Sequence, residues 1–235
     1  MKKNLIFLIF FMLVVSSSIP ISAESYLPKS KLLKIGGGSV GIAVIGFLSE
    51  NSVTESRNSL IKGPILFDSY FQKHIGGDLS INCRKTNFLD NTQGVILTPV
   101  LGMTFLFAAD YRYYNNNRKK QLLQDMYLFS TGLMATAGVT SLFKGVIARE
   151  RPYYYDQDLK IELFEREDKL SFFSGHVSLA FFSMHYFNKR LSLIMRDKNV
   201  SRKWQLFKSF SCYGWASFVA FSRIQASKHY ATDVI

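Results

Sequence analysis

Residues 144–152 read KGVIARERP and residues 173–182 read FSGHVSLAFF, and these two stretches decide how the whole chain is interpreted. Each places polar side chains at the end of an apolar segment, and an acidic connector joins them. Arg offers a planar fork for two oxygens and Lys a point charge, so a lysine, two arginines, a Ser-Gly pair and a histidine gathered in this way suit a bound phosphate. The two stretches therefore predict an anion site between helix ends.

Outward from this centre, the chain is a series of apolar segments without any useful period-two alternation or hairpin turn signals. A helical bundle is the economical interpretation, so the predicted fold class is all-α. Being apolar nearly all round, the segments are either core helices or short membrane spans. The five segments are Gly36–Leu48, Gly94–Ala109, Met126–Phe143, Phe172–Phe187 and Phe210–Phe221.

Charge is distributed unevenly in this chain, whose formal net charge is +12. If the last three segments run antiparallel, Lys144, Ser174 and Arg223 fall at one end of the bundle. The basic connectors Asp110–Gln121 and Asn188–Lys208 then share the other end. Lys- and Arg-rich loops on one side are typical of the cytoplasmic face of a spanning bundle, so we expect the Lys144 end to face outward from a bacterial-type inner membrane, into the periplasm or exterior.

The N-terminus, Met1–Ala23, is predicted to be a signal peptide, with an uncleaved anchor as the alternative. The following residues, 24–93, are expected to form an exported segment with one short apolar helix, Gly36–Leu48. With a mature N-terminus outside and Gly94 also outside, that helix is not expected to be a lone full span. It is instead expected to be re-entrant, interfacial or packed on the bundle.

The second and third clusters add chemistry to the predicted anion site. Ser174 is placed to cap a helix whose free first-turn amides, Gly175 included, bind anions, and His176 falls in that turn. His229 and Asp233 have an i, i+4 spacing, so Asp233 is expected to accept a hydrogen bond from one ring nitrogen. A histidine oriented in this way is a nucleophile or a base, and we assign His229 as the nucleophile.

Taken together, KxxxxxxRP at 144–152, SGH at 174–176 and SRxxxxxHxxxD at 222–233 resemble the type 2 phosphatidic acid phosphatase (PAP2) and vanadium haloperoxidase superfamily. The resemblance implies an all-helical PAP2-like domain at 94–235 and hydrolysis through a phosphohistidine without a metal or other cofactor, with His176 as the acid for the leaving group. The implied catalytic residues are His229, His176 and Asp233, and the implied phosphate ligands are Lys144, Arg151, Ser174, Gly175 and Arg223.

Two departures from the family pattern stand out. Phe173 takes the place where the family usually has Pro before Ser-Gly-His. The chain stops at Ile235, where the family's final helix normally continues, which leaves open that the sequence is a fragment without that helix.

The leading functional expectation is an exported, membrane-associated phosphatase acting on a phosphorylated lipid such as phosphatidate, undecaprenyl diphosphate or a lipid A phosphate. The alternatives are a soluble periplasmic acid phosphatase, a haloperoxidase that binds vanadate as a cofactor, and a non-enzymatic membrane protein. No nucleic-acid partner is expected. We expect Arg149 to be a solvated helix end, His74 and His185 to be structural, and Cys83 and Cys212 to be incidental.

Overall fold

The computed structural model describes residues 27–54, 58–76, 93–113, 118–155 and 166–234. These residues contain no strand, so the predicted all-α fold class is confirmed. The α-helices are α2 (Lys29–Asn51), α3 (Asp68–His74), α5 (Thr98–Tyr113), α6 (Arg118–Ile147), α7 (Gly175–Asp197) and α8 (Arg202–Gln225). The short helices are η2 (Gln93–Leu97), η3 (Pro152–Tyr155), η4 (Arg166–Lys169) and η5 (Ala231–Asp233).

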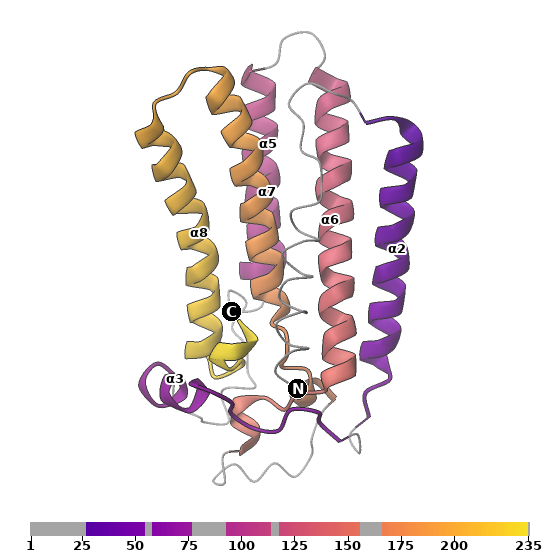
Figure 1. Ribbon diagram of the computed structural model, residues 1–235, viewed down its shortest axis with the longest axis vertical. Helices are drawn as coiled ribbons and strands as arrows, with labels where there is room; N and C mark the ends of the chain where they lie inside the picture. The colour runs from indigo at the N-terminus through magenta and orange to yellow at the C-terminus, as the bar shows by residue number, and fades with distance from the viewer. Residues whose placement is uncertain (1–26, 55–57, 77–92, 114–117, 156–165, 235) are drawn as a thin grey trace.

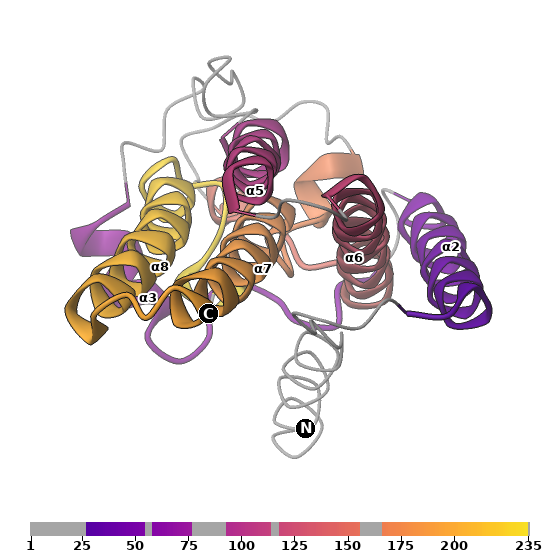
Figure 2. The same ribbon diagram turned by 90° about the horizontal axis from the view of Figure 1, so that it is seen from above.

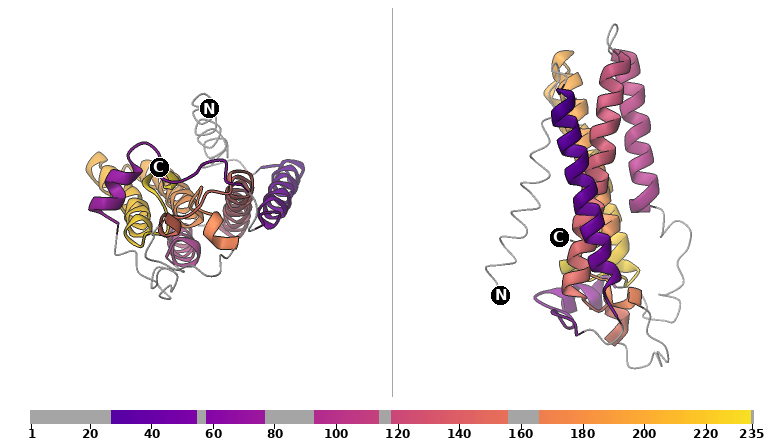
Figure 3. Two further views of the ribbon diagram at one scale, coloured as in Figure 1. Left: turned by 90° about the horizontal axis from the view of Figure 1, so that it is seen from below. Right: turned by 90° about the vertical axis from the view of Figure 1, so that its right-hand side faces the viewer.

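Four long helices, α8, α7, α6 and α2, stand in a row, and α5 packs on one side of α7 (Figures 1 and 2). Helices α2, α6 and α8 run toward the end where α3 lies, whereas α5 and α7 run away from it (Figure 1). We call these the α3 end and, opposite it, the turn end, where residues 198–201 join α7 to α8. In Figure 3, the left view shows the α3 end from below, and the right view shows α2 along its length at the front of the bundle.

Several apolar clusters pack the described residues, and two of them are central to the bundle and to its C-terminal end. Leu106, Leu128, Phe129 and Tyr186 bury their side chains where α5, α6 and α7 meet. At the α3 end, a second cluster of α7, α8 and C-terminal residues packs against α3 and fixes the last residues of the chain; its members are Val177, Ile224, Ala231 and Val234, with Phe71 and Ile75 against them.

Helix α2 lies parallel to α6 along its length. At the turn end the Leu27 amide donates to Gln124 Oε1 over 3.0 Å, and toward the α3 end a Cβ on Gly145 would lie 2.3 Å from the carbonyl carbon of Ser49. The helix is longer than the apolar stretch Gly36–Leu48, because polar residues extend it at both ends. The structure packs α2 against α6. Its 23 residues also make it long enough to be a candidate membrane span, which the sequence did not lead us to expect.

Within the described residues, length and composition make two helices candidates for crossing a membrane, Lys29–Asn51 and the helix within Lys120–Tyr154. Cys212 is a free, buried thiol in α8, and Cys83 lies outside the described residues, as does the proposed signal peptide.

Candidate active site

The end of α6 positions the first motif. Lys144 and Arg151 are seven residues apart and would share one helix face if the helix continued, but α6 ends at Ile147 and Ala148 takes a left-handed φ of 48°. The chain then pairs with residues before α7: the Arg151 amide donates to the Asp168 carbonyl over 2.8 Å, and the Ser171 amide to the Arg149 carbonyl over 3.0 Å. Arg151 therefore reaches the site through a chain reversal and not along a helix face.

Lys144, in the last turn of α6, meets the start of α7. A Cβ on Gly175 would lie 3.9 Å from Lys144 Nζ and 3.8 Å from Thr140 Cγ2. The backbone of Gly175 therefore lies close to the ammonium group of Lys144. The first two motifs, separated by a long connector in sequence, meet in space.

Ser174 is the N-cap of α7, as expected, with extended backbone angles. Its side chain is fully buried, and its Oγ has no hydrogen-bond partner within the part of the chain that the structure describes. Its backbone amide donates to the Asp233 carbonyl over 3.0 Å. An unsatisfied buried hydroxyl beside first-turn amides, close to a lysine, is suited to an anion's oxygens.

His229 follows a second chain reversal, after α8 ends at Gln225 and Ser227 takes a φ of 53°. The imidazole is buried, and its Nδ1 lies 2.8 Å from the Ser171 carbonyl oxygen. A carbonyl only accepts hydrogen bonds, so Nδ1 carries the proton and Nε2 keeps the lone pair. The structure therefore assigns the nucleophilic tautomer.

The hydrogen bond expected from His229 to Asp233 is replaced by this bond to Ser171. Asp233 Oδ2 lies 3.8 Å from His229 Nδ1, beyond hydrogen-bond distance. Asp233 is connected to His229 only indirectly, through Ser171. Its Oδ2 accepts hydrogen bonds from Ser171 Oγ over 2.5 Å and from the Tyr230 amide over 2.8 Å. His229 lies in a bend and Asp233 in the short helix η5, so the two residues do not share the face of an α-helix. This explains why the expected hydrogen bond does not form.

Burial lowers the pKa of His229 well below its ordinary value, and neighbouring positive groups lower it further. These groups are Arg151, Arg223, Lys144 and His176, in decreasing order of effect. The lowered pKa keeps the imidazole neutral at neutral pH. The predicted cations and both histidines of the three motifs therefore gather at one place at the α3 end.

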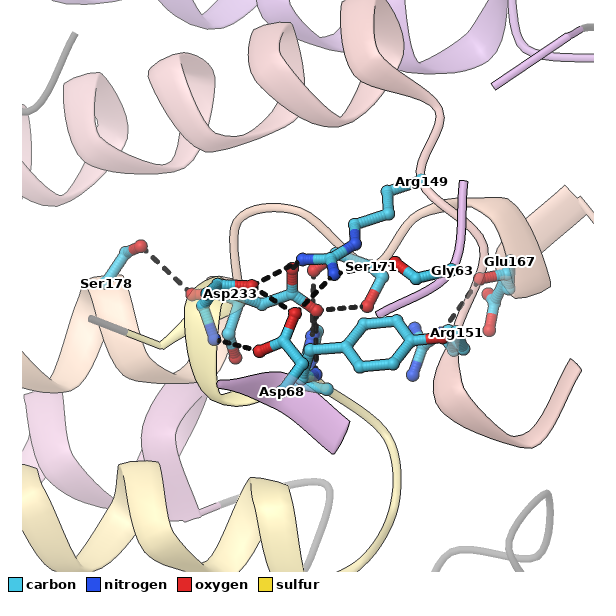
Figure 4. Close-up of polar contacts among 12 residues, drawn as sticks. Gly63, Asp68, Arg149, Arg151, Glu167, Ser171, Ser178 and Asp233 are labelled. Atoms are coloured by element: carbon cyan, nitrogen blue, oxygen red, sulfur yellow. Dashed lines mark hydrogen bonds and ion pairs between the residues drawn. The ribbon is translucent and has the colours of Figure 1, made fainter. Parts of the chain in front are cut away.

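Asp233 balances part of this charge. Burial raises the pKa of its carboxyl group, and Arg149, Ser171 and the Tyr230 amide oppose that rise. Arg149 Nη1 lies 2.5 Å from Asp233 Oδ1 and donates to it (Figure 4).

The expectation that Arg149 is a solvated helix end was wrong, because its side chain is fully buried. Besides Asp233, its guanidinium donates to Thr232 Oγ1 over 2.8 Å, to the Gly63 carbonyl over 2.9 Å and to Asp68 Oδ2 over 2.7 Å (Figure 4). It also lies 4.1 Å from the centroid of the Tyr230 ring. The positive φ at Ala148 turns Arg149 inward, which the sequence did not signal.

Two residues around the site, Asp68 and Ser171, escaped the sequence reasoning, and Arg149 was noticed in the motif but given the wrong role. Asp68 lies in a stretch without a motif, and Ser171 acts partly through its backbone carbonyl. The sequence held one signal for Arg149. It lies two residues before Arg151 in the same motif, and a second arginine so close to a phosphate ligand suggests a structural role. Among the residues that the structure describes, no group of three or more His, Cys, Asp and Glu side chains could hold a metal ion.

A helical bundle that gathers three cations around a buried neutral histidine is suited to a phosphoryl group. The PAP2 superfamily model matches residues 126–235, from within α6 to the end of the chain, and this match supports membership of the PAP2 superfamily. Membership suggests phosphatase-type activity. Comparison with curated proteins and with solved structures gave no match.

Proposed function

We propose that the protein hydrolyses a phosphate or diphosphate ester through a phosphohistidine formed on His229. One observation carries the proposal: a buried imidazole with its Nδ1 proton held by Ser171 lies among Lys144, Arg151 and Arg223. Fixed cations around the transferring phosphoryl group are the main catalytic resource for this reaction, because its transition state spreads charge over the equatorial oxygens.

In the first step, Nε2 of His229 attacks phosphorus and the bond to the ester oxygen breaks. His176 gives a proton to the departing oxygen. Lys144, Arg151, Arg223, the Ser174 hydroxyl and the Gly175 amide hold the other oxygens. In the second step, water attacks phosphorus, His176 takes its proton, and the P–N bond breaks with its electron pair returning to Nε2. Inorganic phosphate leaves.

The substrate we propose is a phosphorylated lipid, because the long helices expose large apolar side chains. Soluble proteins rarely expose apolar patches of this extent, whereas lipid-facing helices do so by necessity. On α2 the exposed residues include Leu33, Val44, Ile45, Phe47 and Leu48, and on α8 they include Trp204, Leu206, Phe207, Phe210 and Phe218.

We also propose that the α3 end faces outward from the membrane. The turn end carries exposed basic residues from two parts of the chain, in keeping with the positive-inside tendency. They are Lys29, Lys31 and Lys34 at the start of α2 and Lys189, Arg196, Lys198, Arg202 and Lys203 around the α7–α8 turn.

The test is phosphate release by the detergent-solubilised chain from phosphatidate, undecaprenyl diphosphate, a lipid A phosphate and a small aryl phosphate. We expect lipid substrates to be preferred, His229→Ala to abolish release, and the exposed His74→Ala to retain it. Radiolabelled phosphate should stay on wild-type protein quenched at alkaline pH, where phosphohistidine survives, and not on His229→Ala. Equal release by wild type and His229→Ala would refute the mechanism, and preference for the aryl phosphate without detergent would refute the lipid.

A further inference from the structure

Asp68, at the start of α3, is buried to the same degree as His229 and Asp233. It is 1% exposed and lies outside residues 126–235, the part that matches the superfamily. A buried carboxylate requires several hydrogen bonds or a cation to offset its lost hydration. The partners of Asp68 therefore indicate what this charge is for.

All but one of those partners belong to the catalytic region. Oδ1 accepts from the Thr232 amide over 2.8 Å, and Oδ2 accepts from Thr232 Oγ1 over 2.7 Å and from Arg149 Nη2 over 2.7 Å. The remaining donor is the amide of Ile65, over 2.9 Å. Thr232 directly precedes Asp233, so Asp68 binds η5 through both the backbone amide and the side-chain hydroxyl of Thr232.

A continuous chain of contacts leads from Asp68 to the nucleophile. Asp68 and Asp233 bind opposite nitrogens of Arg149, and Asp233 binds Ser171, whose carbonyl accepts the Nδ1 proton of His229 (Figure 4). Each link is a buried, charge-assisted or short hydrogen bond, so the geometry at one end constrains the other. The cations on the ends of α6 and α8 do not depend on this chain of contacts.

We propose that Asp68 is a positioning residue for the phosphoryl-transfer site, which sets the orientation of His229 through Arg149, Asp233 and Ser171. The inference rests on the proposed function. It gives residues 58–76 a role in catalysis, because Asp68 from this segment completes the polar network that orients His229. Loss of Asp68 should therefore impair the chemical step and leave phosphate binding largely intact.

The experiment compares Asp68→Asn with Asp125→Asn in the full chain. Asp125 is the matched control, because it is also buried and its Oδ2 lies 2.8 Å from the Nε of buried Arg190, in the α6–α7 interface toward the turn end. Both variants break a buried Asp–Arg pair and should lose comparable stability. We expect Asp68→Asn to lower kcat about 10- to 100-fold with KM within about twofold of wild type, since small displacements of reacting groups cost this much. Asp125→Asn should retain kcat per folded molecule.

A second readout does not require turnover. Histidine labelled with ¹⁵N should give a downfield Nδ1–H resonance for His229, assigned by its loss in His229→Ala. We expect Asp68→Asn to shift or broaden this resonance and Asp125→Asn to preserve it. If Asp68→Asn does not fold, Thr232→Val serves instead. It removes the hydroxyl that donates to Asp68 and accepts from Arg149, and it leaves both charged side chains in place. Thr232→Ser should restore the wild-type signal.

Wild-type kcat per folded molecule in the Asp68 variant, with an unchanged His229 resonance, would overturn the positioning role. If wild type releases no phosphate from any substrate, the proposed function fails and the resonance alone decides. In that case a shift in Asp68→Asn but not in Asp125→Asn supports the positioning of His229, and equal spectra refute it.

Discussion

At the scale of single residues, Ser174 has a hydroxyl that is buried without a partner in the described structure. Removing it costs the free protein no hydrogen bond, whereas a bound phosphate would lose one charge-assisted contact. We expect Ser174→Ala to keep the wild-type melting temperature and to weaken inorganic phosphate binding about 10-fold or more. Titration calorimetry measures the binding.

Ser178→Ala is the control for this prediction, since Ser178 Oγ donates to the Ser174 carbonyl one turn along the same helix. It should bind phosphate as wild type does. A Ser174→Ala variant with unchanged affinity would show that the hydroxyl does not contact the anion.

The lowered pKa of His229 predicts a pH dependence of stability. Below the pKa of the unfolded state, about 6.5, the unfolded chain takes up a proton that the folded imidazole resists. The contribution of His229 is therefore fully present above that pH and is lost as pH falls toward the folded pKa. Between about pH 7 and about pH 5, the melting temperature should fall for wild type and fall less for His229→Gln. Equal slopes of melting temperature against pH would contradict a neutral buried ring.

The motif residues could be predicted because their side-chain types indicate the chemistry that they support. Lys144, Arg151 and His229 keep recognisable types at fixed spacing, and the structure gathers them. The orientation of His229 could not be predicted, because its hydrogen-bond acceptor is a backbone carbonyl, at Ser171, that any residue would supply. Asp68 escaped prediction because its partners are distant in sequence and no local pattern marks it.

At the scale of elements, hydropathy located the long helices but not their ends. The expected segment Phe210–Phe221 is only the apolar part of α8, and most of the basic connector Asn188–Lys208 is helical. Lys and Arg are good helix formers, so a basic stretch continues a helix that an apolar count would end. The end of α6 depends instead on tertiary pairing with the residues before α7, which no local pattern contains.

The contact between α2 and α6 depends on glycines. A Cβ on Gly46 would lie within van der Waals overlap of the Gly138 carbonyl, whereas a Cβ on Gly41 would meet nothing within 4 Å. We expect Gly46→Val to lower the free energy of unfolding by about 1–3 kcal/mol or more, because overpacking forces the two backbones apart. Gly41→Val should change stability little. Thermal melting in detergent compares the two, and equal losses would contradict the close α2–α6 contact.

At the scale of the whole molecule, the proposed orientation can be tested by labelling. In a chain with Cys83 and Cys212 replaced by Ser, single cysteines at Ser30 and Lys198 should resist a membrane-impermeant maleimide in intact cells. Cysteines at Ser52 and Lys73 should react, because these exposed positions lie at the α3 end. The reverse pattern would place the catalytic residues on the cytoplasmic side, and reaction at all four positions would contradict a membrane-spanning α2.

The parallel course of α2 and α6 also bears on how the chain is processed. If a peptidase on the outer side cut after Ala23, residues 24–28 would have to reach the start of α2 on the opposite side. Five extended residues cover about 17 Å, whereas the 23 residues of α2 extend about 35 Å. An outward α3 end and removal of the leader at Ala23 therefore exclude each other while α2 crosses the membrane. If sequencing of the purified protein finds Glu24 as its first residue, an outward α3 end with α2 across the membrane is ruled out.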